Sequence, residues 1–349
     1  MATANRTGRW TDVGLRGGAI LLALGFTALV LVLAGAPPLG TFREIFAGSF
    51  GSLQDFTYVL RGWVPLVLVS AGLLMTFAAG LWNIGIEGQV MMGAISATWA
   101  LRLLQHSSVP PVAAIVLAVL AGMAGGAAWA ALAGGLKTFG GVHEIFGGLG
   151  LNFVATAVTL WLIFGPWKRP GTGSMSGTEP FAEAYWMPDI AGWRVGGWSL
   201  ALAAVAVAAV FFLLRGTYFG LRLKAVGRNA RAAFRLGVPT WQYMLLAFGL
   251  CGALAGLAGA LQVAAVYHRL IPSISSGYGF LGLLVVMLAG YRAPWAAVVA
   301  LFFAAINIGG IQLPIVFQID SSLSGVVQGS LVLFVLMADG ARQRWLAKP

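Results

Sequence analysis

Long apolar runs recur along the whole chain and are separated by short polar, glycine-containing or proline-containing segments. A helix needs about 20 mostly apolar residues to cross a hydrocarbon core of about 30 Å. The pattern predicts an all-α polytopic membrane protein with about ten transmembrane helices. The expected spans are residues 17–35, 60–80, 88–104, 110–133, 144–165, 198–214, 240–266, 278–290, 294–310 and 323–338. The eighth and ninth are so close together that they could instead form a tight hairpin or a re-entrant pair.

The composition supports a membrane-embedded chain. Of the 349 residues, 59% are hydrophobic and 9% are charged, whereas soluble domains carry about 25% charged residues. Most of the surface must therefore face something other than water. We expect residues 1–349 to form a single transmembrane domain. The first apolar run is long for a signal peptide and is followed by Pro37, which would hinder cleavage, so we expect it to be retained.

The basic residues predict the orientation. With the N-terminus inside, 14 of the 21 lysines and arginines fall in inner segments and the remaining 7 in outer segments. Cytoplasmic loops carry the excess of basic residues in membrane proteins, so both termini are expected in the cytoplasm. Residues 1–16 would be the cytoplasmic N-terminus, 166–197 an outer loop and 215–239 a basic inner loop. The net charge of +11 is spread over loops rather than along one stripe, so we expect no nucleic-acid partner.

Small residues crowd two of the predicted spans. Gly249, Gly252, Gly256 and Gly259 recur three or four residues apart in the seventh, and Gly122, Gly125 and Gly126 lie in the fourth. Such spacing lets helix backbones approach closely where lipid supplies no hydrophobic drive. We interpret both sets as helix-packing surfaces.

Catalytic and nucleotide-binding motifs are missing. His143-Glu144 begins like a zinc-protease helix but lacks the second histidine, and Gly134-Gly135-Leu136-Lys137-Thr138 lacks the Gly-Lys pair of a P-loop. The chain has three histidines in all, which argues against a metal site. We predict neither an enzyme nor a cofactor in this chain, so any energy source must be another subunit or an ion gradient.

One polar break is the most informative segment. Residues 80–89 join two apolar spans with three glycines, Asn83, Glu87 and Gln89. Broken helices in transporters expose backbone and polar groups to a substrate path, and an ionisable group near the membrane is a functional candidate. The alternative is that Asn83 and Glu87 cap the third span at the cytoplasmic surface, where an acid favours a helix N-terminus. Asn152, inside the fifth span, could line a pore or join helices by hydrogen bonds.

The sequence resembles a known family at several places. The first is similar to the signature Phe-Asn-Ile-Gly-x-Glu-Gly-Gln of ABC permeases of the branched-chain amino acid/sugar type, specifically their nucleoside-transporting branch, with Trp82 in place of Phe. The stretches that carry the resemblance are Trp82 to Gln89, His143-Glu144-Ile145, Leu151-Asn152, Gly227-Arg228-Asn229, Ala232-Ala233, Gly237, and Gly277 to Gly282.

The resemblance implies the transmembrane subunit of an ABC importer that carries nucleosides across a bacterial inner membrane. It implies a cytoplasmic ABC ATPase that uses the ATP, a second homologous permease subunit and an extracytoplasmic substrate-binding protein or lipoprotein, with membrane lipid around the chain. The alternatives are a monosaccharide permease of the same type and a gradient-driven secondary transporter. The candidate substrate-path residues are Asn83, Glu87, Gln89 and Asn152.

The inner loop also carries a helix signal. Asn229 can cap a short helix, Gly237 can end it and Pro239 forbids its continuation. This element resembles the coupling loop by which ABC permeases dock on their ATPase. Its alternative is a basic loop that touches only anionic lipid. The candidate coupling residues are Arg228, Asn229, Arg231, Ala232, Ala233, Phe234, Arg235 and Gly237.

Overall fold

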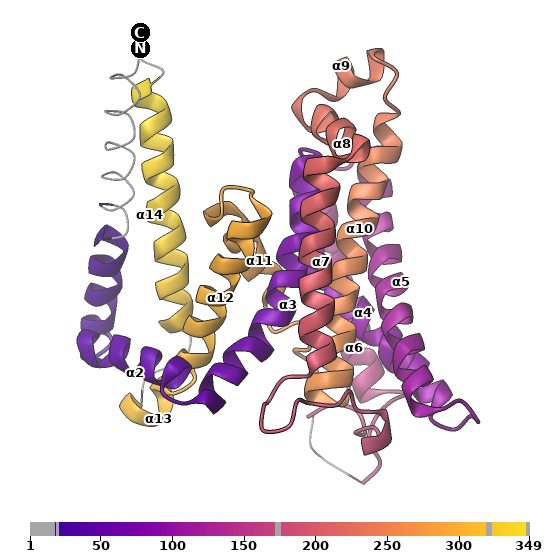
Figure 1. The fold of residues 1–349 in the computed structure, drawn as a ribbon, viewed down its shortest axis with the longest axis vertical. Coiled ribbons are helices and arrows are strands. Elements are labelled where there is room, and N and C mark those ends of the chain that lie inside the picture. Colours follow the sequence, from indigo (N-terminus) through magenta and orange to yellow (C-terminus); the bar gives the residue numbers. More distant parts are fainter. Residues whose placement is uncertain (1–17, 19–20, 172–175, 319–322, 347–349) are drawn as a thin grey trace. The chain divides into compact units, whose positions relative to one another are not determined.

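The computed structural model describes residues 18, 21–171, 176–318 and 323–346. All regular elements among these residues are helical, as predicted (Figure 1). The predicted cytoplasmic segment 1–16 lies outside the described residues. The helices are Leu21–Leu33, α2 (Pro38–Phe50), α3 (Leu53–Ala78), α4 (Ile86–Leu104), α5 (Pro111–Thr138), α6 (Glu144–Phe164), η1 (Glu183–Tyr185), α7 (Gly197–Gly216), α8 (Tyr218–Arg228), α9 (Ala230–Arg235), α10 (Thr240–Leu261), η2 (Gln262–Tyr267), α11 (Tyr278–Leu288), α12 (Ala293–Gly310), α13 (Leu313–Phe317) and α14 (Leu323–Leu346).

The chain divides into two compact units. The first holds residues 1–59 and 302–349, and the second holds residues 60–301. In the first unit, helix Leu21–Leu33 and α2 are bent by 106° at a short break. The Ser49 hydroxyl of α2 donates to the Ala305 carbonyl over 2.6 Å, which fixes α2 on the end of α12.

Helix α2 was not predicted, and its cause is local. Pro38 stands at its first turn, where a missing N–H costs nothing and the fixed φ favours a helix. The next helix, α3, begins seven residues earlier than the predicted span because Ser52 and Asp55 cap it. The Asp55 N–H donates to the Ser52 hydroxyl over 3.1 Å, and that hydroxyl donates to the Asp55 carboxylate over 2.6 Å.

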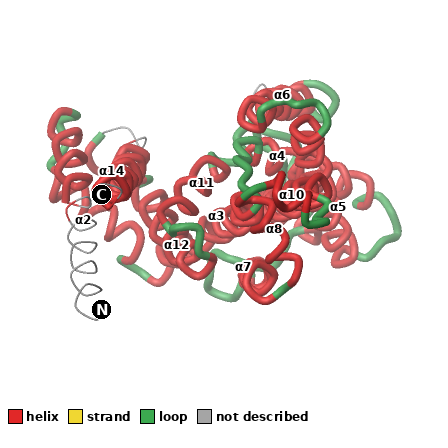
Figure 2. The backbone as a smooth tube through the Cα atoms, turned by 90° about the horizontal axis from the view of Figure 1, so that it is seen from above, coloured by secondary structure: helices red, strands yellow, loops and turns green. Residues whose placement is uncertain are grey.

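The second unit is built around α10. Figure 2 shows α4 and α5 beside it, and these three helices make the most extensive packing in the unit. A Cβ atom at Gly256 would collide with the Gly122 carbonyl oxygen, and one at Gly93 would collide with the Gly256 backbone. The predicted glycine surfaces are therefore confirmed, except that Gly249 has nothing within 4 Å of its missing side chain.

Among the described residues, fewer helices are long enough to span a membrane than the sequence pattern predicted. Six helices there are long and apolar enough to cross a membrane, and a seventh if the bent pair is one span. The predicted eighth span, 278–290, is the 11-residue α11, which at 1.5 Å per residue rises only about 16 Å. A hydropathy pattern cannot distinguish such a half-length helix from a full span. The inner loop also contains a helix that was not predicted, α8.

The glycine contact between α10 and α5 provides the first test. We expect Gly256→Ala to lower the melting temperature of the detergent-solubilised protein, because overpacking a tight core costs about 1–3 kcal/mol. Gly249→Ala adds the same methyl group to the same helix in open space and is the matched control. Equal melting temperatures for the two variants would contradict the packing described here.

Candidate functional site

The predicted substrate-path residues lie together where α4 begins. We call Asn83, Glu87, Gln89 and Asn152 the interior polar cluster; all four side chains are buried. The chain leaves α3 at Ala78 and turns at Gly80, which has φ +71°. It then reaches α4 through a non-helical stretch. Asn83 lies 3.1 Å from the Cys251 sulfur, near the midpoint of the helical segment Thr240–Tyr267. Helix α4 therefore starts inside the bundle.

Glu87 caps a helix that is distant in the sequence. Its carboxylate accepts the Gly277 N–H over 3.0 Å and the Gly279 N–H over 2.6 Å, at the start of α11. The side chain is 5% exposed. A Cβ atom at Gly279 would collide with this carboxylate, so only glycine permits the approach. Because Glu87 is itself in the first turn of α4, one negative charge faces the positive ends of two helices.

Asn83 and Gln89 form a reciprocal amide pair across the break. The Asn83 amide donates to the Gln89 side-chain oxygen over 3.0 Å, and the Gln89 amide donates back over 2.9 Å. Neither side chain is exposed. Each buried amide thereby satisfies a donor and an acceptor of the other, which fixes the non-helical stretch against the first turns of α4.

Asn152 joins α6 to the same break. Its amide donates to the Ile84 carbonyl over 2.9 Å, and its oxygen accepts the Gly88 N–H over 2.8 Å. Both contacts go to main-chain groups that a broken helix leaves unpaired. The interior polar cluster thus pairs the polar backbone of an interrupted span in a region from which water is excluded.

The cytoplasmic-surface capping hypothesis is wrong. The cap residue of α4 is Gly85, which has no side chain, and the side chain that accepts an N–H in its first turn is that of Asn152 rather than Asn83 or Glu87. Asn83 and Glu87 are buried, and Glu87 caps α11. The spacing of Asn83 and Glu87 along the sequence matched a local cap, whereas the partner of Glu87 is 190 residues away. Glycines 277 and 279 were part of the family resemblance, but no feature of the sequence paired them with Glu87.

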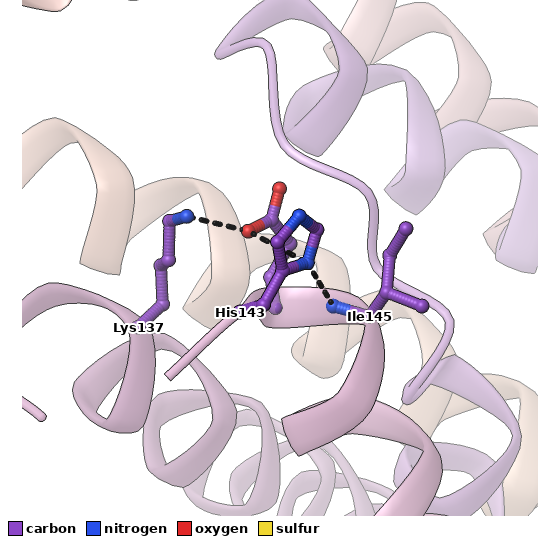
Figure 3. A network of polar contacts seen from close by, with 4 residues as sticks. Lys137, His143 and Ile145 are labelled. Carbon is purple, nitrogen blue, oxygen red and sulfur yellow. Dashed lines mark hydrogen bonds and ion pairs between the residues drawn. The ribbon is translucent and has the colours of Figure 1, made fainter. Parts of the chain in front are cut away.

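His143 and Glu144 close the turn between α5 and α6 (Figure 3). The Lys137 ammonium lies 2.6 Å from the Glu144 carboxylate, and the His143 ring nitrogen accepts the Ile145 N–H over 3.4 Å as the cap of α6. This network ties two helix ends together. Among the described residues no group of three or more histidine, cysteine or acidic side chains could hold a metal ion.

The predicted coupling element is a capped helix. The Asn229 side chain accepts the Ala232 N–H over 3.0 Å, and Gly237 has φ +81° beyond the C-terminal end of α9. Ala233 is buried, whereas the Phe234 ring is 65% exposed. The local helix is confirmed, and Phe234 lies outside the packed face that holds Ala233.

Five other predicted coupling residues surround Phe234. Arg228 is the last residue of α8, and Arg228, Asn229, Arg231, Ala232 and Arg235 are all exposed. Exposed Leu236 follows directly after α9. The element therefore presents two large apolar side chains and several cations on one short projection of the second unit (Figure 1).

The other end of the second unit is covered by the predicted outer loop, opposite α8 and α9 (Figure 1). Its backbone pairs with the segment after α10: the Phe181 N–H donates to the His268 carbonyl over 2.9 Å, and the Met187 N–H to the Ala264 carbonyl over 2.9 Å. The Trp186 ring stacks on the His268 ring at 3.9 Å between centroids. Burial there lowers the pKa of His268, which favours the neutral ring.

Comparison with known proteins identifies the family. A sequence model described as branched-chain amino acid transport system / permease component matches residues 56–336. The chain belongs to this permease family. The resemblance stated from the sequence motifs is thereby confirmed, and the chain is a multi-pass membrane protein of the permease type.

Three curated relatives match almost along their whole length. The chain is 31% identical to a glucose ABC transporter permease of Haloferax volcanii, covering 95% of this chain and 88% of that one. It is 27% identical to a guanosine ABC transporter permease of Bacillus subtilis, covering 93% of both. It is 26% identical to a nucleoside ABC transporter permease of Lactococcus lactis, covering 83% of this chain and 82% of that one.

The Glu87 contact generates the second test. We expect Glu87→Gln to speed amide hydrogen exchange at Gly277 and Gly279, because the new amide group brings a donor to a place where two donors already need an acceptor. An unsatisfied buried donor costs about 1–3 kcal/mol, so the melting temperature should also fall. Glu183→Gln removes one carboxylate from an exposed position, so it controls for the loss of a carboxylate without the loss of a helix cap. Unchanged exchange at residues 277–279 would refute the capping role.

Proposed function

We propose that the chain is the transmembrane subunit of an ABC importer that translocates nucleosides across a bacterial inner membrane. The observation that carries this proposal is the permease-family match over residues 56–336. It is joined by near full-length relatives that are named for guanosine and nucleoside transport. The chain supplies no cofactor of its own, and ATP is used by a partner ATPase.

The proposed arrangement is a single multi-pass domain, residues 1–349, with both termini in the cytoplasm and α11 as a helix that does not cross the membrane by itself. Residues 215–239 would face the cytoplasm and residues 166–197 the outside, because the basic residues divide in that way. The α8–α9 projection and the outer loop lie at opposite ends of the second unit, which supports this assignment (Figure 1). An extracytoplasmic binding protein or lipoprotein would deliver substrate, and a second homologous permease would complete the pathway.

The interior polar cluster would shape the substrate path by stabilising α4 and α11 as helices that start inside the bundle. The side chains of this cluster form hydrogen bonds with other groups of the protein. This holds for Asn83, Glu87, Gln89 and Asn152. Their contribution to transport would therefore be to position backbone at the break rather than to grip the substrate. Helix starts placed inside a bundle are the places where transporters bring polar backbone to a substrate.

A monosaccharide is the alternative substrate class, because the Haloferax volcanii relative at 31% identity is named for glucose. The match to a transport-system permease component favours an ABC permease over a gradient-driven transporter.

The third test separates the two substrate classes. The chain is reconstituted in liposomes with the proposed ATPase, second permease and binding protein. We expect guanosine or another nucleoside to stimulate ATP hydrolysis and to enter the liposomes, and glucose to do neither. Stimulation by glucose alone would assign the chain to sugar transport. Failure of both, with binding protein that is folded and saturated, would overturn the importer proposal.

The α9 projection would dock on the ATPase through Phe234. A large apolar side chain exposed at the tip of a soluble projection is typical of an interface anchor, and the surrounding arginines would steer an acidic partner surface. We expect Phe234→Ala to reduce ATPase co-purification and to abolish substrate-stimulated hydrolysis. Truncating an interface anchor costs about 2–4 kcal/mol, which is at least tenfold in affinity.

The matched control for Phe234 is Phe212→Ala. Phe212 is also 65% exposed, but it lies within the apolar helix α7. This variant should retain the ATPase. The docking role fails if Phe234→Ala co-purifies the ATPase at the wild-type level and transports normally.

A further inference from the structure

A cavity of about 700 Å³ lies in the second unit at the end that carries α8. It is formed where α3 and α7 end, where α12 begins and where α8 turns back toward them. Neither the interior polar cluster nor α9 contributes to it. The side chains that give it its chemistry are Arg215, Lys224, Arg292, Phe77, Tyr291 and Trp295.

The charge of this cavity is entirely positive. Arg215, Lys224 and Arg292 line it, no acidic residue does, and all three are exposed. The Lys224 ammonium donates to the Leu214 carbonyl at the end of α7 over 2.6 Å, which holds it at the wall. None of the ion pairs found among the described residues involves these three cations. Like charges gathered without a counter-ion repel one another, so the cavity suits an anion.

The wall of the cavity is aromatic. Tyr291 packs its ring edge-on against Phe77 at 5.2 Å between centroids, and Trp295 is 57% exposed. Tyr291 has φ +60° directly after Gly290 at +59°. A bulky residue rarely adopts this left-handed conformation, and such strain gathers at functional sites. Tyrosine and tryptophan rings that are apolar at one end and polar at the other suit the headgroup level of a membrane.

The surfaces on both sides of the cavity are apolar and exposed. On α7, Val205 and Phe212 are each 65% exposed, and on α12, Val298 is 58% exposed. These side chains continue from the cavity along the two helices that flank it. A ligand that contacts both the cationic cavity and the apolar surfaces beside it needs two parts. One is an anionic group that pairs with the three cations, and the other is a long apolar chain that covers α7 and α12.

We propose that this cavity binds the headgroup of an anionic phospholipid, with its acyl chains along α7 and α12. Basic pockets between transmembrane helices are recognition sites for such headgroups. The inference goes beyond the proposed transport function, because a nucleoside or a monosaccharide is uncharged and would leave the three cations without an anionic partner. A free phosphate-bearing solute has the same anionic chemistry but would leave the apolar surfaces uncovered.

Native mass spectrometry of the purified chain tests the proposal. We expect the wild type to bind phosphatidylglycerol more tightly than phosphatidylcholine with the same acyl chains. Each basic residue near an anionic headgroup contributes about fivefold in affinity, so this preference should fall about fivefold in Arg292→Gln and roughly 100-fold when Arg215→Gln and Lys224→Gln are added. The control triple Arg228→Gln, Arg231→Gln and Arg235→Gln removes the same charge outside the cavity and should keep the preference.

Two results of the binding measurement would overturn the site. One is an undiminished phosphatidylglycerol preference in the cavity triple variant. The other is displacement of the lipid by millimolar inorganic phosphate, which would assign the cavity to a soluble anion instead. A photoactivatable phosphatidylglycerol on the wild-type chain makes the test independent of variant folding. Crosslinks within residues 211–215 and 291–295 are expected, and crosslinks confined to other segments refute the proposal.

Discussion

The structure of the second unit depends on one requirement, which is that backbone N–H groups remote from water must find an acceptor within the protein. A helix that starts at the membrane surface can leave its first N–H groups to water, but α4 and α11 start inside the bundle. In lipid an unpaired backbone group costs several kcal/mol. Glu87 supplies the acceptor for α11 with both carboxylate oxygens. Asn152 supplies it for the Gly88 N–H in the first turn of α4. The cost of burying the Glu87 charge is offset by these hydrogen bonds and by two helix N-termini.

Close packing makes such a break tolerable. The glycine contacts among α4, α5 and α10 bring backbones together so closely that a methyl group would collide, and they fix the part of α4 that follows the break. The amide pair of Asn83 and Gln89 then spans the break itself. A polar cluster with every partner satisfied is rigid, whereas a partly satisfied one is destabilising. The residues that a sequence pattern nominates as a substrate path thus form hydrogen bonds with one another and with the backbone around the break.

Features that depend on neighbouring residues could be predicted from the sequence, whereas contacts between residues far apart in the chain could not. Asn229, Gly237 and Pro239 act within a few residues, so the α9 helix and its caps could be predicted in detail. The glycine repeats could also be interpreted from the sequence alone, because small residues at helical spacing in a membrane helix are typical of helix-packing surfaces. The partner of Glu87 could not be predicted, since the pairing exists only after α4 and α11 have packed. The full span expected at 278–290 failed for a related reason: an apolar run shows that a segment is removed from water but not how far its helix extends, and the 11-residue α11 is only partly buried, with Phe280 47% exposed.

A close backbone contact links the break before α4 to the end of α8. Gly80, at the start of the break, packs on Gly227 at the end of α8, and a Cβ atom at Gly227 would lie only 2.8 Å from the Gly80 nitrogen. Two residues after Gly227 the chain reaches Asn229, the cap of α9. This contact connects the end of α8 to residues 78–80, from which the non-helical chain leads to Asn83. Helices α8 and α9 also pack on α10, whose Cys251 contacts Asn83. An ATPase docked on α9, as proposed, would thus be linked to the break in α4 both through this backbone contact and through α10.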